Sequence, residues 1–261
     1  MLELRNVCVA AGGGVTSGGA ASDSGAADSS GGFEIINDVS LTLEKKKIYV
    51  ITGPNGGGKT SLAKAIMGIY PISGGKILLD GEDIAEKTIT ERANMGIGYA
   101  FQAPTRFKGL RVRDFLSIAA GENTEKRLFS LLVDVGLCAQ DYIDRELNAS
   151  FSGGELKRVE IASILARDLR VALFDEPEAG IDLWSFQRLT ETFRNLREMT
   201  DTTIIIISHQ ERILRLADEV ILIAGGKVTE ITTPDKILWD IECKNPDCEC
   251  VNCVEKEVVV C

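Results

Sequence analysis

Short strand-like segments make up most of the N-terminal part of the chain. In the stretch FEIINDVSLTL, apolar residues at Ile35, Val39, Leu41 and Leu43 stand among polar ones, which predicts a strand with one buried face. An alternating start precedes this stretch, and the apolar runs KIYVIT, KILLD and MGIGYA follow it, separated by short polar turns. The pattern predicts an N-terminal region that is rich in short strands.

The spacing of apolar residues becomes helical between about residues 114 and 166. Leu128, Leu131 and Leu132 recur at intervals of three and one, and the run LKRVEIASILA shows a second amphipathic pattern. We therefore expect a helical segment, at about residues 103–166, inserted between the sheet-forming parts.

Three apolar runs, VALFDE, TTIIIIS and EVILIA, follow the helical segment. Helix-like stretches at residues 183–199 and 211–216 separate them. This alternation is typical of a parallel sheet covered by helices, so the chain is predicted to have an α/β fold.

Composition and charge narrow the range of partners. Lys and Arg number 29 against 39 Asp and Glu, and the resulting net charge of −10 repels the phosphodiester backbone, so we expect no nucleic-acid partner. Residues 11–32 are almost wholly Gly, Ala, Ser and Asp, which predicts a flexible insert. No secretion signal or membrane-spanning run is evident, so we expect a cytoplasmic protein without direct membrane insertion.

The motif GPNGGGKT fits the phosphate-binding pattern G-x-x-x-x-G-K-[ST] in the context that its mechanism needs. It follows the strand KIYVIT and precedes the helix-like run SLAKAIMGI. Backbone N–H groups of such a loop surround the phosphates at a helix N-terminus, with Lys59 reaching the β- and γ-phosphates and the Thr60 hydroxyl on Mg²⁺. The predicted nucleotide contacts are Gly53, Pro54, Asn55, Gly56, Gly57, Gly58, Lys59, Thr60 and Ser61.

Two carboxylates stand at the end of the buried strand VALFDE. Asp175 is predicted to face the Mg²⁺ shell, and Glu176 to act as the general base for an attacking water. A surface turn is the commoner explanation of an isolated Asp-Glu pair, but the phosphate-binding loop upstream favours hydrolysis of a nucleoside triphosphate.

Two further polar residues follow predicted strands. His209 comes directly after TTIIIIS, where we expect it to sense the γ-phosphate and to orient Glu176 and the water. Gln102, in GYAFQAP, could bridge the metal and the water to a docked partner, although by its residue type alone it would be a plain loop residue.

A second glycine-rich turn, FSGGE, precedes a helical run. Ser152 and the N–H groups of Gly153 and Gly154 are predicted to form a second phosphate-binding helix start. Because one nucleotide is already held by residues 53–61, this turn is expected to close on the nucleotide of another copy of the chain.

Taken in order, GPNGGGKT, Gln102, FSGGE, VALFDE, AGID and His209 resemble the motifs of the ATP-binding-cassette (ABC) ATPases over about residues 1–235. The resemblance implies a P-loop NTPase fold of the ABC type, with a mixed RecA-like core sheet, an antiparallel β subdomain and a helical subdomain. It also implies hydrolysis of ATP to ADP and phosphate in an ATP-dependent head-to-tail homodimer. Glu155 of the FSGGE turn and Asp182 in the loop between the two sites join the expected nucleotide-binding residues.

Within this family, FSGGELKR, SHQERIL and GYAFQAP resemble SufC, the soluble ATPase of iron–sulfur cluster assembly. This resemblance implies a scaffold partner like SufB and SufD. The alternative is the ATP-binding subunit of a membrane transporter, with a transmembrane permease helix docked on residues 102–113. A nonenzymatic nucleotide-binding scaffold is disfavoured because Glu176 and His209 are both present. The chain departs from transporter ATPases because VCVAAGGG carries no aromatic residue to stack on adenine.

The cysteines are concentrated in a C-terminal tail, residues 236–261. Cys243, Cys248, Cys250 and Cys253 are spaced as C-x4-C-x-C-x2-C, which is compatible with zinc or an iron–sulfur cluster, but the irregular spacing favours a thiol-bearing tail without metal. Cys261 lies further along the same tail. The two cysteines outside the tail, Cys8 and Cys138, lie among apolar residues and are predicted to be small core residues.

Overall fold

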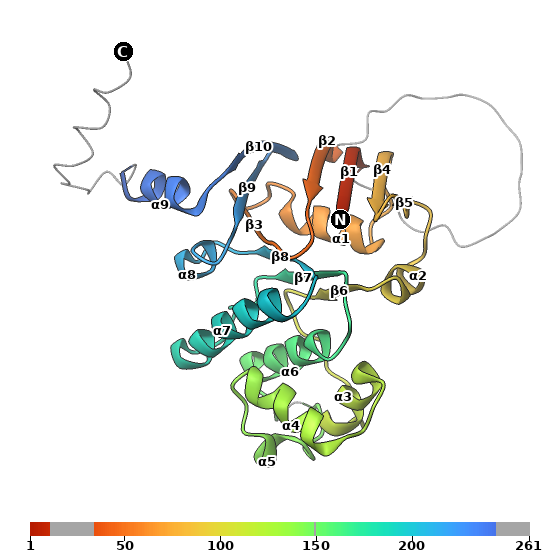
Figure 1. Cartoon of the computed structure of the whole chain (residues 1–261), viewed down its shortest axis with the longest axis vertical. Helices are drawn as coiled ribbons and strands as arrows, with labels where there is room; N and C mark the ends of the chain where they lie inside the picture. Colours follow the sequence, from red (N-terminus) through yellow and green to blue (C-terminus); the bar gives the residue numbers. More distant parts are fainter. Residues whose placement is uncertain (11–33, 149, 244–261) are drawn as a thin grey trace, which may run out of the picture.

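The computed structural model describes residues 1–10, 34–148 and 150–243. Figure 1 shows an antiparallel sheet near one end of the molecule, a second sheet in the middle and a group of helices, α3 to α6, at the other end. The predicted insert at residues 11–32 and the tail residues Cys248, Cys250 and Cys253 lie outside the described residues.

The central sheet has six strands in the order β10-β9-β3-β8-β7-β6. The five strands from β9 to β6 are parallel, and β10 pairs with β9 in the antiparallel sense. The strands are β3 (Ile48–Thr52), β6 (Ile97–Ala100), β7 (Val171–Asp175), β8 (Thr203–Ile207), β9 (Glu219–Ala224) and β10 (Lys227–Thr232). The parallel strands follow the predicted apolar runs, whereas β10 was not predicted.

The second sheet is antiparallel, with the order β2-β1-β4-β5. Its strands are β1 (Leu2–Ala10), β2 (Glu34–Leu43), β4 (Gly74–Leu79) and β5 (Glu82–Asp83). This is the antiparallel β subdomain that the family resemblance implies, and the mixed central sheet is likewise confirmed.

Strand β8 shows how the central sheet organises two cores. Ile204 and Ile206 pack into the core shared with the helices, whereas Ile205 and Ile207 pack into the core shared with α1 and the antiparallel sheet. Successive side chains of a strand point to opposite faces, so a run of four isoleucines serves both cores. Burial of each side chain stabilises the fold by about 1.5–3 kcal/mol.

Nine helices are present in the described parts of the chain. They are α1 (Lys59–Met67), α2 (Ile89–Asn94), α3 (Val112–Ala120), α4 (Glu125–Asp134), α5 (Ala139–Tyr142), α6 (Gly153–Leu165), α7 (Leu183–Met199), α8 (Glu211–Leu214) and α9 (Pro234–Cys243). Helices α3 to α6 occupy the segment that the apolar spacing predicts to be helical.

The prediction that Cys138 is a core residue is wrong. Cys138 is exposed and forms the N-cap of α5, while its neighbours Leu137 and Ala139 are buried. The chain turns into a new helix at this point, so adjacent residues face different surroundings. Cys8 is half-buried.

A buried arginine holds the helix that follows the phosphate-binding loop. Arg92 of α2 is 2% exposed, and its Nη1 donates hydrogen bonds of 2.8 Å to the carbonyls of Ala65 and Ile66 in the last turn of α1. The carbonyls at a helix C-terminus lack partners within the helix, and a cation placed there satisfies them. Arg92 therefore anchors the C-terminal end of α1 to α2.

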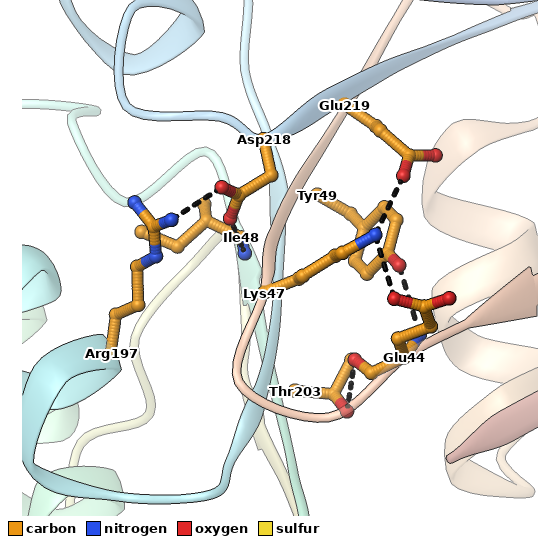
Figure 2. Close-up of polar contacts among 8 residues, drawn as sticks. All are labelled: Glu44, Lys47, Ile48, Tyr49, Arg197, Thr203, Asp218 and Glu219. Carbon is orange, nitrogen blue, oxygen red and sulfur yellow. Dashed lines mark hydrogen bonds and ion pairs between the residues drawn. The ribbon is translucent and has the colours of Figure 1, made fainter.

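A polar network ties together the strand ends that lie opposite the phosphate-binding loop (Figure 2). Lys47 Nζ lies 2.7 Å from a carboxylate oxygen of Glu44 and 3.1 Å from one of Glu219, and these two contacts raise the pKa of Lys47 above its ordinary value. Asp218 Oδ2 accepts a hydrogen bond from Ile48 N at 2.8 Å, and its other oxygen pairs with Arg197. The starts of β3 and β9 and the end of α7 are thereby joined.

Candidate functional site

The GPNGGGKT loop connects β3 to α1 and is held close to β9. A Cβ atom placed on Gly53 would lie 2.1 Å from the Ile223 carbonyl oxygen, and the φ angle of Gly53 is +134°, so only glycine fits at this position. Lys59 Nζ donates hydrogen bonds to the carbonyls of Gly53 at 2.7 Å and Pro54 at 2.9 Å. The lysine therefore lies across the mouth of its own loop.

Helix α1 begins without a side-chain cap. Its N-cap is Gly58, with φ 104°, and no side chain bonds to the N–H groups of the first turn. Burial lowers the pKa of Lys59, and the nearby carboxylates of Glu176 and Asp175 oppose that shift. The open N–H groups and the lysine together favour an anion at this helix start.

A cleft of about 460 Å³ lies against the loop. Its lining comprises Ile35, Asn55, Gly56, Gly57, Gly58, Lys59, Thr60, Ser61, Gln102 and Glu176. Seven of the nine residues predicted for the first phosphate site therefore face one hollow, together with the predicted base and the predicted bridging glutamine.

Asp175, at the end of β7, is fully buried beside Thr60. Its Oδ1 accepts a hydrogen bond from Thr60 Oγ1 at 3.2 Å, and its Oδ2 accepts one from Tyr99 OH at 2.9 Å. Burial raises the pKa of Asp175, while the hydrogen bonds from Tyr99 and Thr60 act in the opposite direction. The carboxylate and the hydroxyl predicted to hold Mg²⁺ thus lie in contact.

Glu176 has a strained backbone that turns its side chain into the cleft. Its φ angle is +45°, a value that non-glycine residues rarely adopt, and its N–H donates to the carbonyl of Ile207 at 3.0 Å. Gln102 Nε2 donates a hydrogen bond of 2.8 Å to Glu176 Oε2. The predicted base and the predicted bridging residue are therefore directly bonded to each other.

His209 lies after β8 and contacts the strand that carries the loop. Its Nδ1 is 3.2 Å from Thr52 Oγ1. Burial and the neighbouring Lys59 lower the pKa of His209, and Glu176 raises it by a smaller amount. The ring is thus near both charged groups of the cleft, but no hydrogen bond joins it to Glu176 within the described residues.

The FSGGE turn begins α6 with a complete capping box. Ser152 Oγ accepts from Glu155 N at 3.2 Å, and Glu155 Oε2 accepts from Ser152 N at 2.7 Å. The other carboxylate oxygen of Glu155 accepts a hydrogen bond from Tyr142 OH. Glu155 therefore stabilises the helix start within its own chain, and its predicted contact with nucleotide stays a prediction.

The FSGGE turn packs against the loop that leads into α7. A Cβ atom on Gly154 would lie 2.1 Å from the carbonyl oxygen of Gly180. Asp182 is the N-cap of α7, where its Oδ1 accepts from Trp184 N and Ser185 N at 3.1 and 3.0 Å. None of the residues predicted at this second grip, Ser152, Gly153, Gly154, Glu155 and Asp182, lines the cleft.

Lys157 connects α6, which begins at the FSGGE turn, to the residues of the cleft. This role was not predicted from the sequence. It is 1% exposed, and its Nζ donates to the carbonyl of Asp175 at 3.0 Å, to the carbonyl of Phe101 and, at 3.5 Å, to that of Gln102. The spacing of residues along α6 could have indicated that Lys157 is buried, because Lys157 stands on the same helix face as buried Ile161 and Ile164. A charged residue on that stripe has to find polar partners inside the protein.

A smaller hollow of about 160 Å³ opens beside Gln102. Phe101, Phe107 and Phe115 line it together with Glu160. The side chains of Phe101 and Phe107 are 40% and 38% exposed. Glu160 Oε1 accepts from Phe101 N at 3.0 Å, whereas its buried Oε2 has no hydrogen-bond partner and lies 3.8 Å from Lys157 Nζ. Burial raises the pKa of Glu160. The segment that carries Gln102 thus borders an apolar surface.

Within residues 1–10, 34–148 and 150–243, no three His, Cys, Asp or Glu side chains come together as a metal cluster. Cys243 is the last residue of α9, and the proposed tail site otherwise lies outside the described part. Among the helices described, none has the length and apolar character needed to cross a bilayer.

Comparison with known proteins identifies similar sequences and folds. Residues 36–179 match the family described as ABC transporter. The chain is 38% identical, over 216 residues, to an uncharacterized ABC transporter ATP-binding protein of Methanocaldococcus jannaschii, covering 79% of this chain and 86% of that protein.

Two solved structures share the fold. A dimeric bacterial ABC transporter cassette superposes with a TM-score of 0.76 at 19% identity, covering 90% of this chain and 99% of its own. A bacterial Atm1-family ABC exporter with ATP bound superposes with a TM-score of 0.75 at 22% identity, and this chain spans 40% of that chain.

Proposed function

Because the chain belongs to the ABC transporter family and is an ATP-binding ATPase of that family, we propose that it is the ATP-driven subunit of a larger assembly. Two copies close on two ATP molecules, and hydrolysis reopens them. The closing and opening change the conformation of a partner protein, for which the first candidate is a SufB/SufD-like scaffold for iron–sulfur cluster assembly. The hydrogen bond between Gln102 and Glu176 carries this proposal, since it joins the partner-facing segment to the reaction centre.

The residues of the cleft divide the work of hydrolysis. The loop from Gly53 to Ser61 binds the phosphates through its N–H groups. Lys59 leaves the carbonyls of Gly53 and Pro54 and turns toward the β- and γ-phosphates. Glu176 accepts a proton from the attacking water through the carboxylate that Gln102 now holds. His209, which contacts Thr52 at the end of β3, orients this carboxylate and the water.

The donors near Thr60 fit Mg²⁺. The hydroxyl of Thr60, the carboxylate of Asp175 and the side-chain carbonyl of Gln102 are hard oxygen ligands, and Thr60 and Asp175 are already within hydrogen-bond distance. When bound, Mg²⁺ would offset the negative charge of the phosphates. Tyr99 keeps the carboxylate of Asp175 in position by donating to its second oxygen.

The position of the second grip supports the proposed homodimer. Ser152, Gly153 and Gly154 do not line the cleft of their own chain. A head-to-tail pair would bring this turn against the γ-phosphate in the other copy, with Asp182 between the two sites. A similar cassette is described as dimeric, which supports the same arrangement here.

We propose that the partner docks on the segment from Gln102 to Arg113, the surface expected to receive a helix of a membrane partner. The exposed aromatic rings of Phe101 and Phe107 border the small hollow, and Lys157 ties the carbonyls of Phe101 and Gln102 to that of Asp175. A partner that moves this segment would therefore move Gln102 relative to Glu176. Docking and hydrolysis would be coupled through these few bonds.

A transmembrane permease is the second candidate partner. The names of the similar proteins favour it. The relative from Methanocaldococcus jannaschii is described as an ABC transporter ATP-binding protein, and the two solved structures as an ABC transporter cassette and an ABC exporter. The motifs FSGGELKR, SHQERIL and GYAFQAP favour the scaffold. The nucleotide chemistry is the same in either assembly.

Purification with the native partner tests the proposal. The full chain is isolated from its own cells with bound proteins, in detergent and without it, and ATP hydrolysis is measured before and after the partner is removed. A water-soluble, β-rich partner that stimulates hydrolysis supports the scaffold assignment. An integral membrane protein that does so replaces it with transport, and a chain that hydrolyses no ATP in any state contradicts both.

A further inference from the structure

The most exposed large apolar side chain in the described part of the molecule is a tryptophan. Trp184, in the first turn of α7, is 82% exposed, whereas Phe186, two residues later, is 6% exposed. Tryptophan is enriched at protein interfaces, where a partner covers its large apolar ring system.

Trp184 is held at a defined position beside the FSGGE turn. Asp182 caps the turn that contains it, and Arg158 of α6 donates to Ser185 Oγ at 2.7 Å and to the carbonyl of Gly154 at 3.3 Å. The close approach of Gly154 to Gly180 joins the same two helix starts from the other side. Trp184 and the FSGGE turn therefore belong to one rigid surface.

We propose that Trp184 is a contact between two copies of this chain and becomes buried when the ATP-bound homodimer closes. The inference rests on the proposed homodimer, and it adds a residue that none of the nucleotide motifs contains. The second copy is the favoured occupant because the surface is continuous with the turn that would touch the other copy's nucleotide. Tryptophan is also among the residues that most often carry the binding energy of an interface.

Fluorescence can follow this residue alone. The chain has two tryptophans, so Trp239→Phe leaves Trp184 as the single reporter, and Glu176→Gln keeps ATP unhydrolysed. Addition of Mg-ATP should shift the emission of Trp184 to shorter wavelength and reduce its quenching by acrylamide. Both changes should appear over the protein concentrations at which sedimentation detects dimers, and Mg-ADP should cause neither.

A substitution completes the test. Trp184→Ser, in the Glu176→Gln chain, should weaken the ATP-dependent dimer at least about tenfold by sedimentation. Ile118→Ser is the matched control, because Ile118 is 74% exposed on α3 and has no assigned role in the dimer. ATP binding to dilute, monomeric protein should be equal in the two variants.

The outcomes separate this inference from the homodimer itself. If dimers form while the emission stays unchanged or Trp184→Ser dimerises normally, the inference is wrong and the homodimer stands. A shift that does not depend on protein concentration, or that requires the partner protein, also overturns it. If sedimentation detects no dimers with Mg-ATP, the inference and the proposed homodimer fail together.

Discussion

The helices α1 and α6 both begin in a glycine-rich turn, but the two starts are built differently. At α1, the N-cap is Gly58 and no side chain bonds to the first-turn N–H groups. At α6, Ser152 and Glu155 cap each other's backbone. The N-terminus of α1 can therefore surround a phosphate with its N–H groups. The N-terminus of α6 is already fixed by its capping box and offers only the N–H groups of its first residues.

The surroundings of the two starts differ in the same sense. The α1 start faces a cleft lined with Lys59, Gln102 and Glu176, so it has chemistry of its own. The α6 start packs on Gly180 and faces outward. A change at the first should therefore disturb ATP binding or chemistry in a single chain, while a change at the second should affect nucleotide chemistry only when two chains meet.

Removal of the base should have the largest effect. Glu176→Gln keeps a hydrogen-bonding side chain beside Gln102 but cannot accept the proton of the water, so turnover should fall about 10²- to 10⁴-fold. ATP binding should stay unchanged. Phosphate release and equilibrium binding of labelled ATP measure the two quantities, and a turnover near that of the unmodified chain would remove Glu176 from its assigned role.

Lys157 tests the bridge between the two regions. Lys157→Met leaves the Asp175 and Phe101 carbonyls and the Glu160 carboxylate without their cation, so the free energy of unfolding should fall by about 3–5 kcal/mol. Urea unfolding measures this loss. Adding Glu160→Gln should recover part of it, because the second change removes the unpaired buried charge. Additive losses would show that the two side chains do not interact.

Direct comparison of the two starts comes from Lys59→Ala and Ser152→Ala. Loss of the lysine removes charge-assisted hydrogen bonds of about 1.5–3 kcal/mol, so ATP binding to dilute protein should weaken about 10- to 100-fold. Ser152→Ala should leave that binding unchanged and lower only hydrolysis. Titration of dilute protein with labelled ATP separates them, and weaker binding by the Ser152 variant would contradict a second grip that acts on the other copy.

The sequence predicts the cleft better than the connection between its parts. Glycine spacing and strand ends locate Lys59, Thr60, Asp175 and Glu176, because each role depends on a local backbone form that the motif specifies. Lys157 depends instead on the carbonyls of Phe101 and Gln102, which lie more than fifty positions away along the chain, and no local pattern encodes such contacts.

The fold shows the same distinction between local and remote information. The buried parallel strands are continuous apolar runs and were predicted, as was the helical segment. Strand β10 alternates between exposed and half-buried positions and pairs on one side only, so its apolar signal is weak. Cys138 was misplaced because its buried neighbours do not reveal the turn that exposes it.

Substitution of the two neighbouring glycines at the N-terminus of α6, Gly153 and Gly154, should have a smaller effect, and this effect is on the stability of the chain. Gly154→Ala places a methyl group against the Gly180 carbonyl and should destabilise the chain by about 1–3 kcal/mol. Gly153→Ala is the matched control, since nothing lies within 4 Å of its added carbon, and it should stabilise the helix by up to about 1 kcal/mol. Thermal unfolding compares the two, and equal midpoints would mean that Gly180 can move away.

The smallest effect concerns pH and belongs to the α1 side alone, where His209 lies near Lys59. The pKa of His209 is lowered in the folded chain, so on acidification the unfolded chain takes up this proton first. The contribution of His209 to stability is therefore complete above the ordinary histidine pKa, about 6.5, and is lost as the pH falls below it. Urea unfolding of the unmodified chain and of the His209→Gln variant is compared between pH 8 and about pH 5.5. The difference isolates the contribution of His209 to stability, because all other ionisable groups titrate in both proteins. The stability of the unmodified chain should fall more steeply toward the acid end, and parallel curves would show that neither burial nor Lys59 lowers the pKa of the ring.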